Sequence, residues 1–227
     1  MRQDDVRQLD PSYYEENLLL KIAVLNKSAP TPVNAAVVQQ AIDYAKQYHQ
    51  GQTRQTGEPY YTHPLAVAIM VCDYLFETDA IVTSILHDTL EDTSLTYAMI
   101  EEVFGADIAF QVEAITRIKP SGKISSAEIL KRFWNDKQYK LILIKLFDRL
   151  HNMQTIFAKS PEKQAKIVRE TLEYFLALGE ILELPHLGDM LYQQCYETNK
   201  VLGLIQSSEL QLDQEVKLAD LLASENN

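Results

Sequence analysis

Apolar residues recur along this chain mostly at intervals of three and four positions, which is the spacing of an amphipathic helix. Leu18, Ile22 and Leu25 show this spacing near the start, and Ile81 and Ile85 show it further on. The period-two alternation of a half-buried strand is scarce, so the pattern predicts an all-α protein. The predicted helical segments are about 34–50, one that begins at residue 64, 79–92, 96–104, 138–157, 161–178, 185–204 and 208–223.

Breaks in this periodicity predict how the chain is divided. The proline-rich stretch 29–32 cannot continue a helix, so residues 1–33 are expected to form an N-terminal extension. Residues 34–204 are expected to form the main domain. Residues 205–227 are expected to form a helical tail that packs on this domain or on a second subunit, so the oligomeric state stays open, a homo-oligomer included.

Charge and composition narrow the class of partner. The net charge is −11 and the pI is about 4.9, which argues against general binding to nucleic acid or to an anionic membrane. The first residues lack the apolar core of a signal peptide, and the apolar runs are shorter than a membrane span. Cys72 and Cys195 lie in helical patterns without a C-x-x-C pair, which suits a reducing cytoplasm.

One predicted helix ends in a concentration of ionisable groups. His87 and Asp88 are adjacent. Glu91 follows His87 by four positions and Asp92 follows Asp88 by four, which is about one helical turn. Burying so much charge is costly unless something offsets it. The stretch therefore predicts a bound cation or a very basic partner.

Four candidate metal ligands come from separate parts of the chain. His63 precedes Pro64, a predicted first helical residue, so His63 is expected at a helix cap. With His87, Asp88 and Asp148 it forms a mixed nitrogen and oxygen set, which favours Mn²⁺, Fe²⁺ or Zn²⁺ over Ca²⁺. Such a site suits the formation of hydroxide near neutral pH and the polarisation of a phosphoryl oxygen.

Each of these residues also has an ordinary structural interpretation. His63 could be a cap, Asp148 could be the ion-pair partner of Lys145 or Arg149, and Glu91 could belong to a solvated helix end. Taken together they favour a metal site, because Asp148 lies in the most apolar predicted helix and needs a positive partner there. Glu91 and Asp92 exceed the needs of one ion, which suggests general acid–base work.

The order and spacing of these residues resemble the H…HD…D pattern of the HD-domain phosphohydrolases, a helical superfamily. The flanking segments further resemble the hydrolase domain of the RelA/SpoT alarmone enzymes over about 37–197. The segments that carry the resemblance are HQGQTR (49–54), GEPY (57–60), HPLAVA (63–68), LHDTLEDT (86–93), FG (104–105) and IKLFDRLHNM (144–153).

This resemblance implies an HD-type bundle of about ten helices and an activity. The activity is Mn²⁺-dependent removal of pyrophosphate from the ribose 3′ position of guanosine tetra- and pentaphosphate, with other divalent cations left open. The substrate would be a small guanine nucleotide rather than a macromolecule, and the chain would carry no synthetase domain. By position, the metal ligands are His63, His87, Asp88 and Asp148, the acidic pair that handles water is Glu91 and Asp92, and the residues lining the nucleotide are Arg54 and Asn152.

Three positions depart from the family pattern and keep alternatives open. Gln55 stands where a second basic residue is common, Phe147 replaces a usual alanine before Asp148, and Leu90 replaces a common valine. A different 2′- or 3′-phosphorylated nucleotide is therefore a second hypothesis. A non-catalytic nucleotide sensor that has kept the fold is a third, although all proposed ligands and both acids are present.

Overall fold

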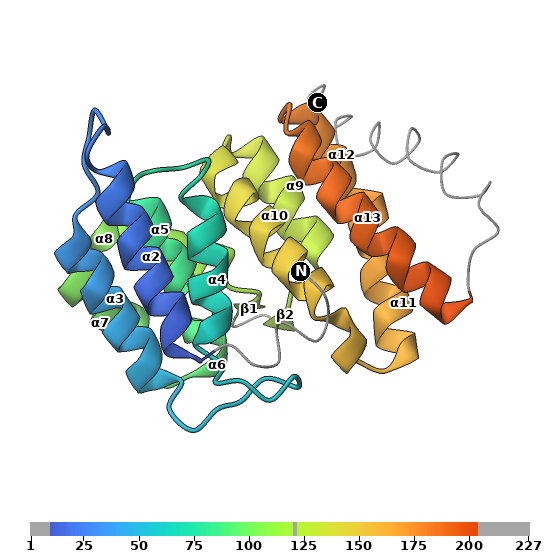
Figure 1. The fold of residues 1–227 in the computed structure, drawn as a ribbon, viewed down its shortest axis with the longest axis horizontal. Helices are drawn as coiled ribbons and strands as arrows, with labels where there is room; N and C mark the ends of the chain where they lie inside the picture. The colour runs from blue at the N-terminus through green and yellow to red at the C-terminus, as the bar shows by residue number, and fades with distance from the viewer. Residues whose placement is uncertain (1–9, 120–121, 204–227) are drawn as a thin grey trace. The chain divides into compact units, whose positions relative to one another are not determined.

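The computed structural model describes residues 10–119 and 122–203 (Figure 1). These residues form helices joined by short loops, with one hairpin of two short strands, so the all-α prediction is confirmed. The chain divides into two compact units, Met1–Lys123 and Ile124–Asn227, and each is described by itself. The domain boundaries expected near residues 33 and 204 stay predictions.

The first unit contains the helices that carry the His-Asp stretch. Its core joins Leu18 and Ile22 of the helix Ser12–Leu25 to Leu65, Ile85 and other fully buried residues. This helix also packs against the helix that carries His63, so it is part of the folded unit. The elements are α2 (Ser12–Leu25), α3 (Ala35–Tyr48), α4 (Thr62–Val71), α5 (Thr78–Leu86), α6 (Thr89–Asp92), α7 (Tyr97–Phe104), α8 (Ala106–Ile115), β1 (Ile118–Lys119) and β2 (Gly122–Lys123).

Capping residues place the ends of several of these helices close to their expected positions. The Asn34 side chain accepts hydrogen bonds from the backbone N–H groups of the first turn of α3, and Thr96 does the same for α7. Gly105 follows α7 with a φ of 89°, a conformation that favours glycine. The helices expected at about 34–50 and 96–104 are confirmed.

The start of α4 corrects one expectation. The helix begins at Thr62, with Tyr61 before it, so His63 lies within the first turn and not at the cap. Pro64 is compatible with this position because the first backbone N–H groups of a helix have no intrahelical acceptor. The expected helix start at residue 64 was therefore wrong by two positions.

The expected unbroken helix over 79–92 is also wrong, since α5 ends at Leu86 and α6 begins at Thr89. Side chains at the break bond to the preceding carbonyl groups. The His87 ring lies 2.7 Å from the Ser84 carbonyl oxygen, and the Thr89 hydroxyl donates to the Leu86 carbonyl at 2.6 Å. Such local bonds compete with the helical backbone pattern.

The second unit is built around α10 (Tyr139–Gln154), whose residues are mostly buried. A capping box begins the preceding helix, α9 (Ser126–Asn135): the Ser125 hydroxyl accepts from the Glu128 N–H, and the Glu128 carboxylate accepts from the Ser125 N–H. Met153, Val168 and Cys195 share a buried apolar cluster. The other elements are α9 (Ser126–Asn135), a 3₁₀ turn (Ile156–Ala158), α11 (Pro161–Glu170), a π-helical turn (Thr171–Phe175), α12 (Leu176–Ile181) and α13 (Pro185–Leu202).

The predicted helical tail after residue 204 lies outside the described residues. Among the helices that are described, none has the length and apolarity needed to cross a bilayer.

The burial pattern of α2 yields a stability prediction. Leu18 has no exposed surface, whereas Leu20 on the same helix is 65% exposed. We expect Leu18→Ala to lower the free energy of unfolding by about 2–5 kcal/mol, because it leaves a cavity in the core. Urea unfolding followed by circular dichroism measures this change.

Leu20→Ala is the matched control, because it removes the same atoms from the same helix. We expect it to change the unfolding free energy by less than about 0.5 kcal/mol. Equal effects of the two substitutions would contradict the packing of α2 in the first unit.

Candidate metal centre and its acidic neighbours

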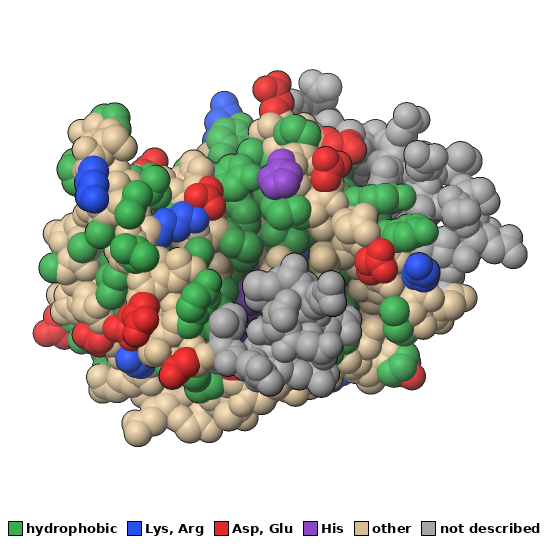
Figure 2. Space-filling model, viewed as in Figure 1, with side chains coloured by type: hydrophobic (Ala, Val, Ile, Leu, Met, Phe, Trp, Pro, Cys, Tyr) green, Lys and Arg blue, Asp and Glu red, His purple; other side chains and the backbone are tan. Residues whose placement is uncertain are grey.

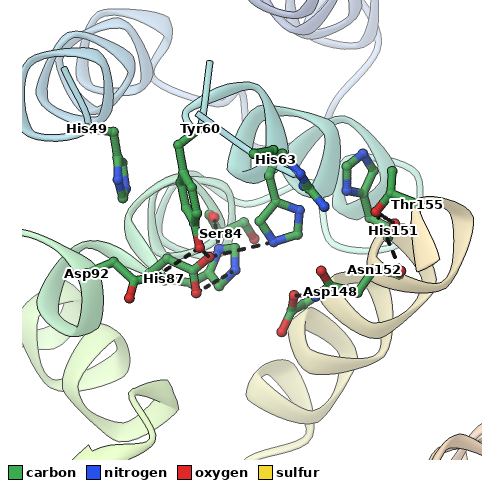
Figure 3. A network of polar contacts seen from close by, with 12 residues as sticks. His49, Tyr60, His63, Ser84, His87, Asp92, Asp148, His151, Asn152 and Thr155 are labelled. Atoms are coloured by element: carbon green, nitrogen blue, oxygen red, sulfur yellow. Dashed lines mark hydrogen bonds and ion pairs between the residues drawn. The ribbon is translucent and has the colours of Figure 1, made fainter. Parts of the chain in front are cut away.

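His87 and Asp88 lie at the junction of α5 and α6, where the helix is interrupted. The His87 Nδ1 atom is 2.7 Å from the Ser84 carbonyl oxygen, which can only accept, so Nδ1 carries the ring proton (Figure 3). In a neutral imidazole the other nitrogen, Nε2, then carries no proton and presents a lone pair that can bind a metal ion. A backbone carbonyl that fixes the tautomer in this way is typical of metal-binding histidines.

His63 brings a second imidazole from α4 to the same place. Its Nε2 atom lies 3.6 Å from Asp88 Oδ2, and His87 Nε2 lies 3.2 Å from Asp88 Oδ1. One ligand atom from each of the three residues falls within 4.8 Å of the other two. The predicted convergence of these three residues is therefore present within the first unit.

The chemistry of this cluster fits a divalent cation. The unprotonated His87 Nε2 and the Asp88 carboxylate both present lone pairs, and two acceptors at 3.2 Å repel unless a positive charge or a proton satisfies both. Both histidines are 2% exposed, so water provides little compensation. Two imidazoles and a carboxylate are ligands that Zn²⁺, Mn²⁺ and Fe²⁺ accept.

Asp92 lies one turn beyond Asp88 and is connected to it through Tyr60. The Tyr60 hydroxyl is 3.0 Å from Asp88 Oδ2 and 2.9 Å from Asp92 Oδ2. Protein atoms around the Asp92 carboxyl and the charge of Asp88 raise its pKa above the usual 3.8, while the bond from Tyr60 opposes this rise. Burial and the two carboxylates raise the pKa of Tyr60, so its hydroxyl stays protonated.

Glu91, the other predicted acid, faces the end of α8. Its Oε2 atom accepts a hydrogen bond from the Arg117 backbone N–H at 3.2 Å. The contact joins α6 to the segment that leads into the β1–β2 hairpin. Glu91 and Asp92 thus have different partners, which allows them different roles.

Arg54 lies on the loop between α3 and α4, which is ordered by backbone bonds. The Arg54 N–H donates to the Glu58 carbonyl at 2.9 Å, and the N–H of Gly57 donates to the Arg54 carbonyl at 2.9 Å. The Arg54 Nε atom is 3.3 Å from Glu58 Oε1. These contacts give the segment around Arg54 a defined conformation.

Asp148 and Asn152 belong to α10 in the second unit, so their relation to the histidines stays a prediction. Asn152 Nδ2 donates to Asp148 Oδ1 at 2.6 Å, which confirms that the two lie one turn apart on one face. Lys145 Nζ donates to Asp148 Oδ2 at 2.7 Å. Asp148 therefore pairs with Lys145, as expected if its role is structural.

Sequence reasoning did not give the contacts that three residues of the segment before α4 make. Tyr60 bonds to both carboxylates, and Gln52 donates to the Asp92 backbone carbonyl at 2.8 Å. His49 lies 2.7 Å from Gln52 Oε1 and stacks on the Tyr60 ring. All three fall within the segments 49–54 and 57–60 that were singled out, but spacing alone does not show which side chains reach Asp92.

Fold and site define the class of this protein. A family model described as HD domain matches residues 41–183, which is more than half of the chain. The chain belongs to the HD-domain family, as its sequence pattern predicted.

The relatives within this class are alarmone enzymes. The chain is 35% identical over 195 residues to the guanosine-3′,5′-bis(diphosphate) 3′-pyrophosphohydrolase of Aquifex aeolicus, covering 82% of this chain and 28% of the relative. It is 36% identical over 166 residues to the bifunctional (p)ppGpp synthase/hydrolase SpoT of Escherichia coli, covering 70% and 24%. The chain thus spans less than a third of the length of either relative.

A solved structure shares the fold. It is described as a metazoan ortholog of SpoT that hydrolyzes ppGpp and plays a role in starvation responses. The TM-score is 0.53 at 18% sequence identity, and the match covers 78% of this chain and 99% of that one. At this identity the likeness supports the helical fold.

The cluster yields a prediction about cation binding. We expect Asp88→Asn to weaken Mn²⁺ binding at least about tenfold, because the substitution keeps the shape but removes the only charge among the three clustered ligands. Isothermal titration of the metal-free protein with Mn²⁺ measures the affinity.

Asp107→Asn is the control, since Asp107 is an exposed aspartate at the start of α8 in the same unit. It should leave the Mn²⁺ affinity unchanged. An Asp88→Asn protein that binds Mn²⁺ as tightly as the wild type would contradict the assignment of Asp88 as a ligand.

Proposed function

We propose that this chain hydrolyses the 3′-diphosphate of guanosine tetra- and pentaphosphate, releasing pyrophosphate and leaving GDP or GTP. The observation that carries the proposal is the cluster of His63, His87 and Asp88, with Asp92 linked to it through a tyrosine hydroxyl. Relatives at 35% and 36% identity that are named for this chemistry support it.

The cation would be held by His63, His87 and Asp88, and we propose Asp148 as a fourth ligand and Mn²⁺ as the ion. Support for Asp148 comes from the order of the family pattern in the sequence. A bound divalent cation supplies a water of lowered pKa and polarises a phosphoryl oxygen. With Asp148 as a ligand, Lys145 would have to share or release the carboxylate oxygen that it contacts at 2.7 Å.

The acidic pair would manage the protons of the reaction. The oxygen of a water attacks the phosphorus bonded to the ribose 3′ oxygen, the bond from that phosphorus to the 3′ oxygen breaks, and the 3′ oxygen gains a proton. Asp92 is suited to accept the proton of the water, because its raised pKa makes it a better base than an ordinary aspartate. Glu91, held by the Arg117 N–H, would orient the water and assist proton transfer.

Arg54 and Asn152 are proposed to bind the nucleotide. Arg54 has a planar guanidinium that can donate to phosphate oxygens or stack on a base, and its Nε atom now pairs with Glu58. The side-chain Nδ2 of Asn152 donates to Asp148, and the Oδ1 atom of the same amide can accept a hydrogen bond from a further donor. These roles follow the family pattern.

A small-molecule substrate agrees with the surface charge. On the face shown in Figure 2, the described lysine and arginine side chains occur mostly singly and among acidic ones. Nucleic-acid binding usually needs a basic patch or stripe. A cytoplasmic location stays a prediction, supported by two buried free thiols.

A direct assay tests the activity. Purified protein with Mn²⁺ and guanosine tetraphosphate should release pyrophosphate and GDP in equal amounts. Asp92→Asn should lower kcat by about 10²–10⁴-fold, because an amide cannot accept the proton of the water. The Asp107→Asn protein should retain the wild-type rate.

A substrate panel separates the alternatives. Gln55 motivates a test of other nucleotides with a 2′- or 3′-phosphate under the same metal conditions, and faster turnover of one of them would replace the proposed substrate. Tight binding of guanosine tetraphosphate without product release by the wild type would favour the sensor hypothesis.

A further inference from the structure

The Tyr60 hydroxyl is placed between the candidate metal ligand Asp88 and the candidate base Asp92. It is 3.0 Å from Oδ2 of the first and 2.9 Å from Oδ2 of the second (Figure 3). A hydroxyl has one proton and therefore cannot donate a full hydrogen bond to two carboxylates at once. Tyr60 is thus the direct connection between the metal-binding cluster and the acid beside it.

Tyr60 is itself held rigidly by the loop that carries it. Its ring stacks on His49, with 4.7 Å between the ring centroids and 23° between the planes, and His49 is 1% exposed. Gln52 Nε2 donates to the Asp92 carbonyl at 2.8 Å, so Gln52 Oε1 is the acceptor for His49 Nδ1–H at 2.7 Å. The Tyr60 N–H donates to the Gln52 carbonyl at 3.0 Å. His49, Gln52 and Tyr60 thus form a connected set of contacts, which we call the frame.

This frame holds Asp92 at two points. Gln52 fixes its backbone carbonyl, and Tyr60 contacts its carboxylate. The side-chain direction of an aspartate in a short helix at a surface would otherwise vary among rotamers. A base must lie within hydrogen-bond reach of the proton that it removes, so this direction matters for the rate.

We infer that Tyr60 is a positioning residue that aims the Asp92 carboxylate and holds it at a fixed distance from the metal-binding carboxylate of Asp88. The inference deepens the proposed function and rests on it. If Asp88 binds a cation, its carboxylate becomes a weaker hydrogen-bond acceptor, so the Tyr60 hydroxyl would donate mainly to Asp92. Asp92 is then held most firmly in the state that is ready to react.

The adjacent tyrosine provides a matched control. Tyr61 packs its ring against the apolar core, and Lys46 lies over that ring at 5.8 Å from its centroid. Tyr60→Phe and Tyr61→Phe each remove one oxygen atom from neighbouring positions. A general effect of lost hydroxyl groups on folding should therefore affect both variants alike.

The experiment measures kcat, KM and Mn²⁺ affinity for the wild type, both tyrosine variants, Asp92→Asn and the Tyr60→Phe/Asp92→Asn double variant. We expect Tyr60→Phe to lower kcat by about 10- to 100-fold, with KM and the Mn²⁺ dissociation constant changed less than about threefold. Tyr61→Phe should stay within about twofold of wild type. In the Asp92→Asn background, Tyr60→Phe should change kcat by less than about threefold, because it acts through Asp92.

Three results of these kinetic and metal-binding measurements would overturn the inference. In the first, Tyr60→Phe keeps a kcat within twofold of wild type. In the second, Tyr60→Phe lowers the Mn²⁺ affinity more than tenfold. In the third, Tyr60→Phe causes the same loss of kcat in the Asp92→Asn background as in the wild type. An inactive wild type would refute the proposed function instead.

The urea unfolding midpoints of the metal-free proteins then test whether Tyr60 and Asp92 are energetically coupled in the folded protein. Non-additive midpoint shifts of Tyr60→Phe and Asp92→Asn would support the coupling, and additive shifts would overturn it.

Discussion

The hydrogen bond from the His87 ring to the Ser84 carbonyl is the interaction on which the site depends. It fixes the proton on Nδ1 and turns an unprotonated Nε2 toward Asp88. The same bond engages a carbonyl that an unbroken helix would use for the N–H of residue 88, and so contributes to the end of α5. One local interaction thus contributes to the helix break and also orients a candidate metal ligand.

The interruption also determines how the acids are arranged. Asp88 is the N-cap residue of the short helix α6, and the Asp92 N–H donates to the Asp88 carbonyl at 2.9 Å, so the two carboxylates stay one turn apart. The loop before α4 supplies both Tyr60, which reaches the two carboxylates, and the chain that leads to His63. A change in this loop would therefore affect the candidate ligand His63 and the candidate base Asp92 together.

The sequence could predict the all-α fold and the His63, His87 and Asp88 cluster, because apolar periodicity and spaced motifs record both. It could not predict the break after Leu86, since helical spacing says nothing about a ring N–H that bonds to its own helix. Nor could it assign Tyr60, whose role depends on how the loop folds back toward Asp92. For Asp148, both the metal-ligand and the lysine-pair interpretations were visible, and the structure provides the lysine.

Charge imposes a further constraint on the proposed reaction. Asp88, Glu91 and Asp92 lie at one helix junction in a chain of net charge −11, so a nucleotide polyphosphate would meet repulsion there. A bound divalent cation offsets two of these three negative charges and is often the largest single charge in such a site. Substrate binding should then depend on the cation, and by linkage the substrate must raise the affinity for the cation by the same factor. The acidic composition that argues against nucleic-acid binding would therefore make the proposed cation a condition for substrate binding as well as for the proposed hydrolysis.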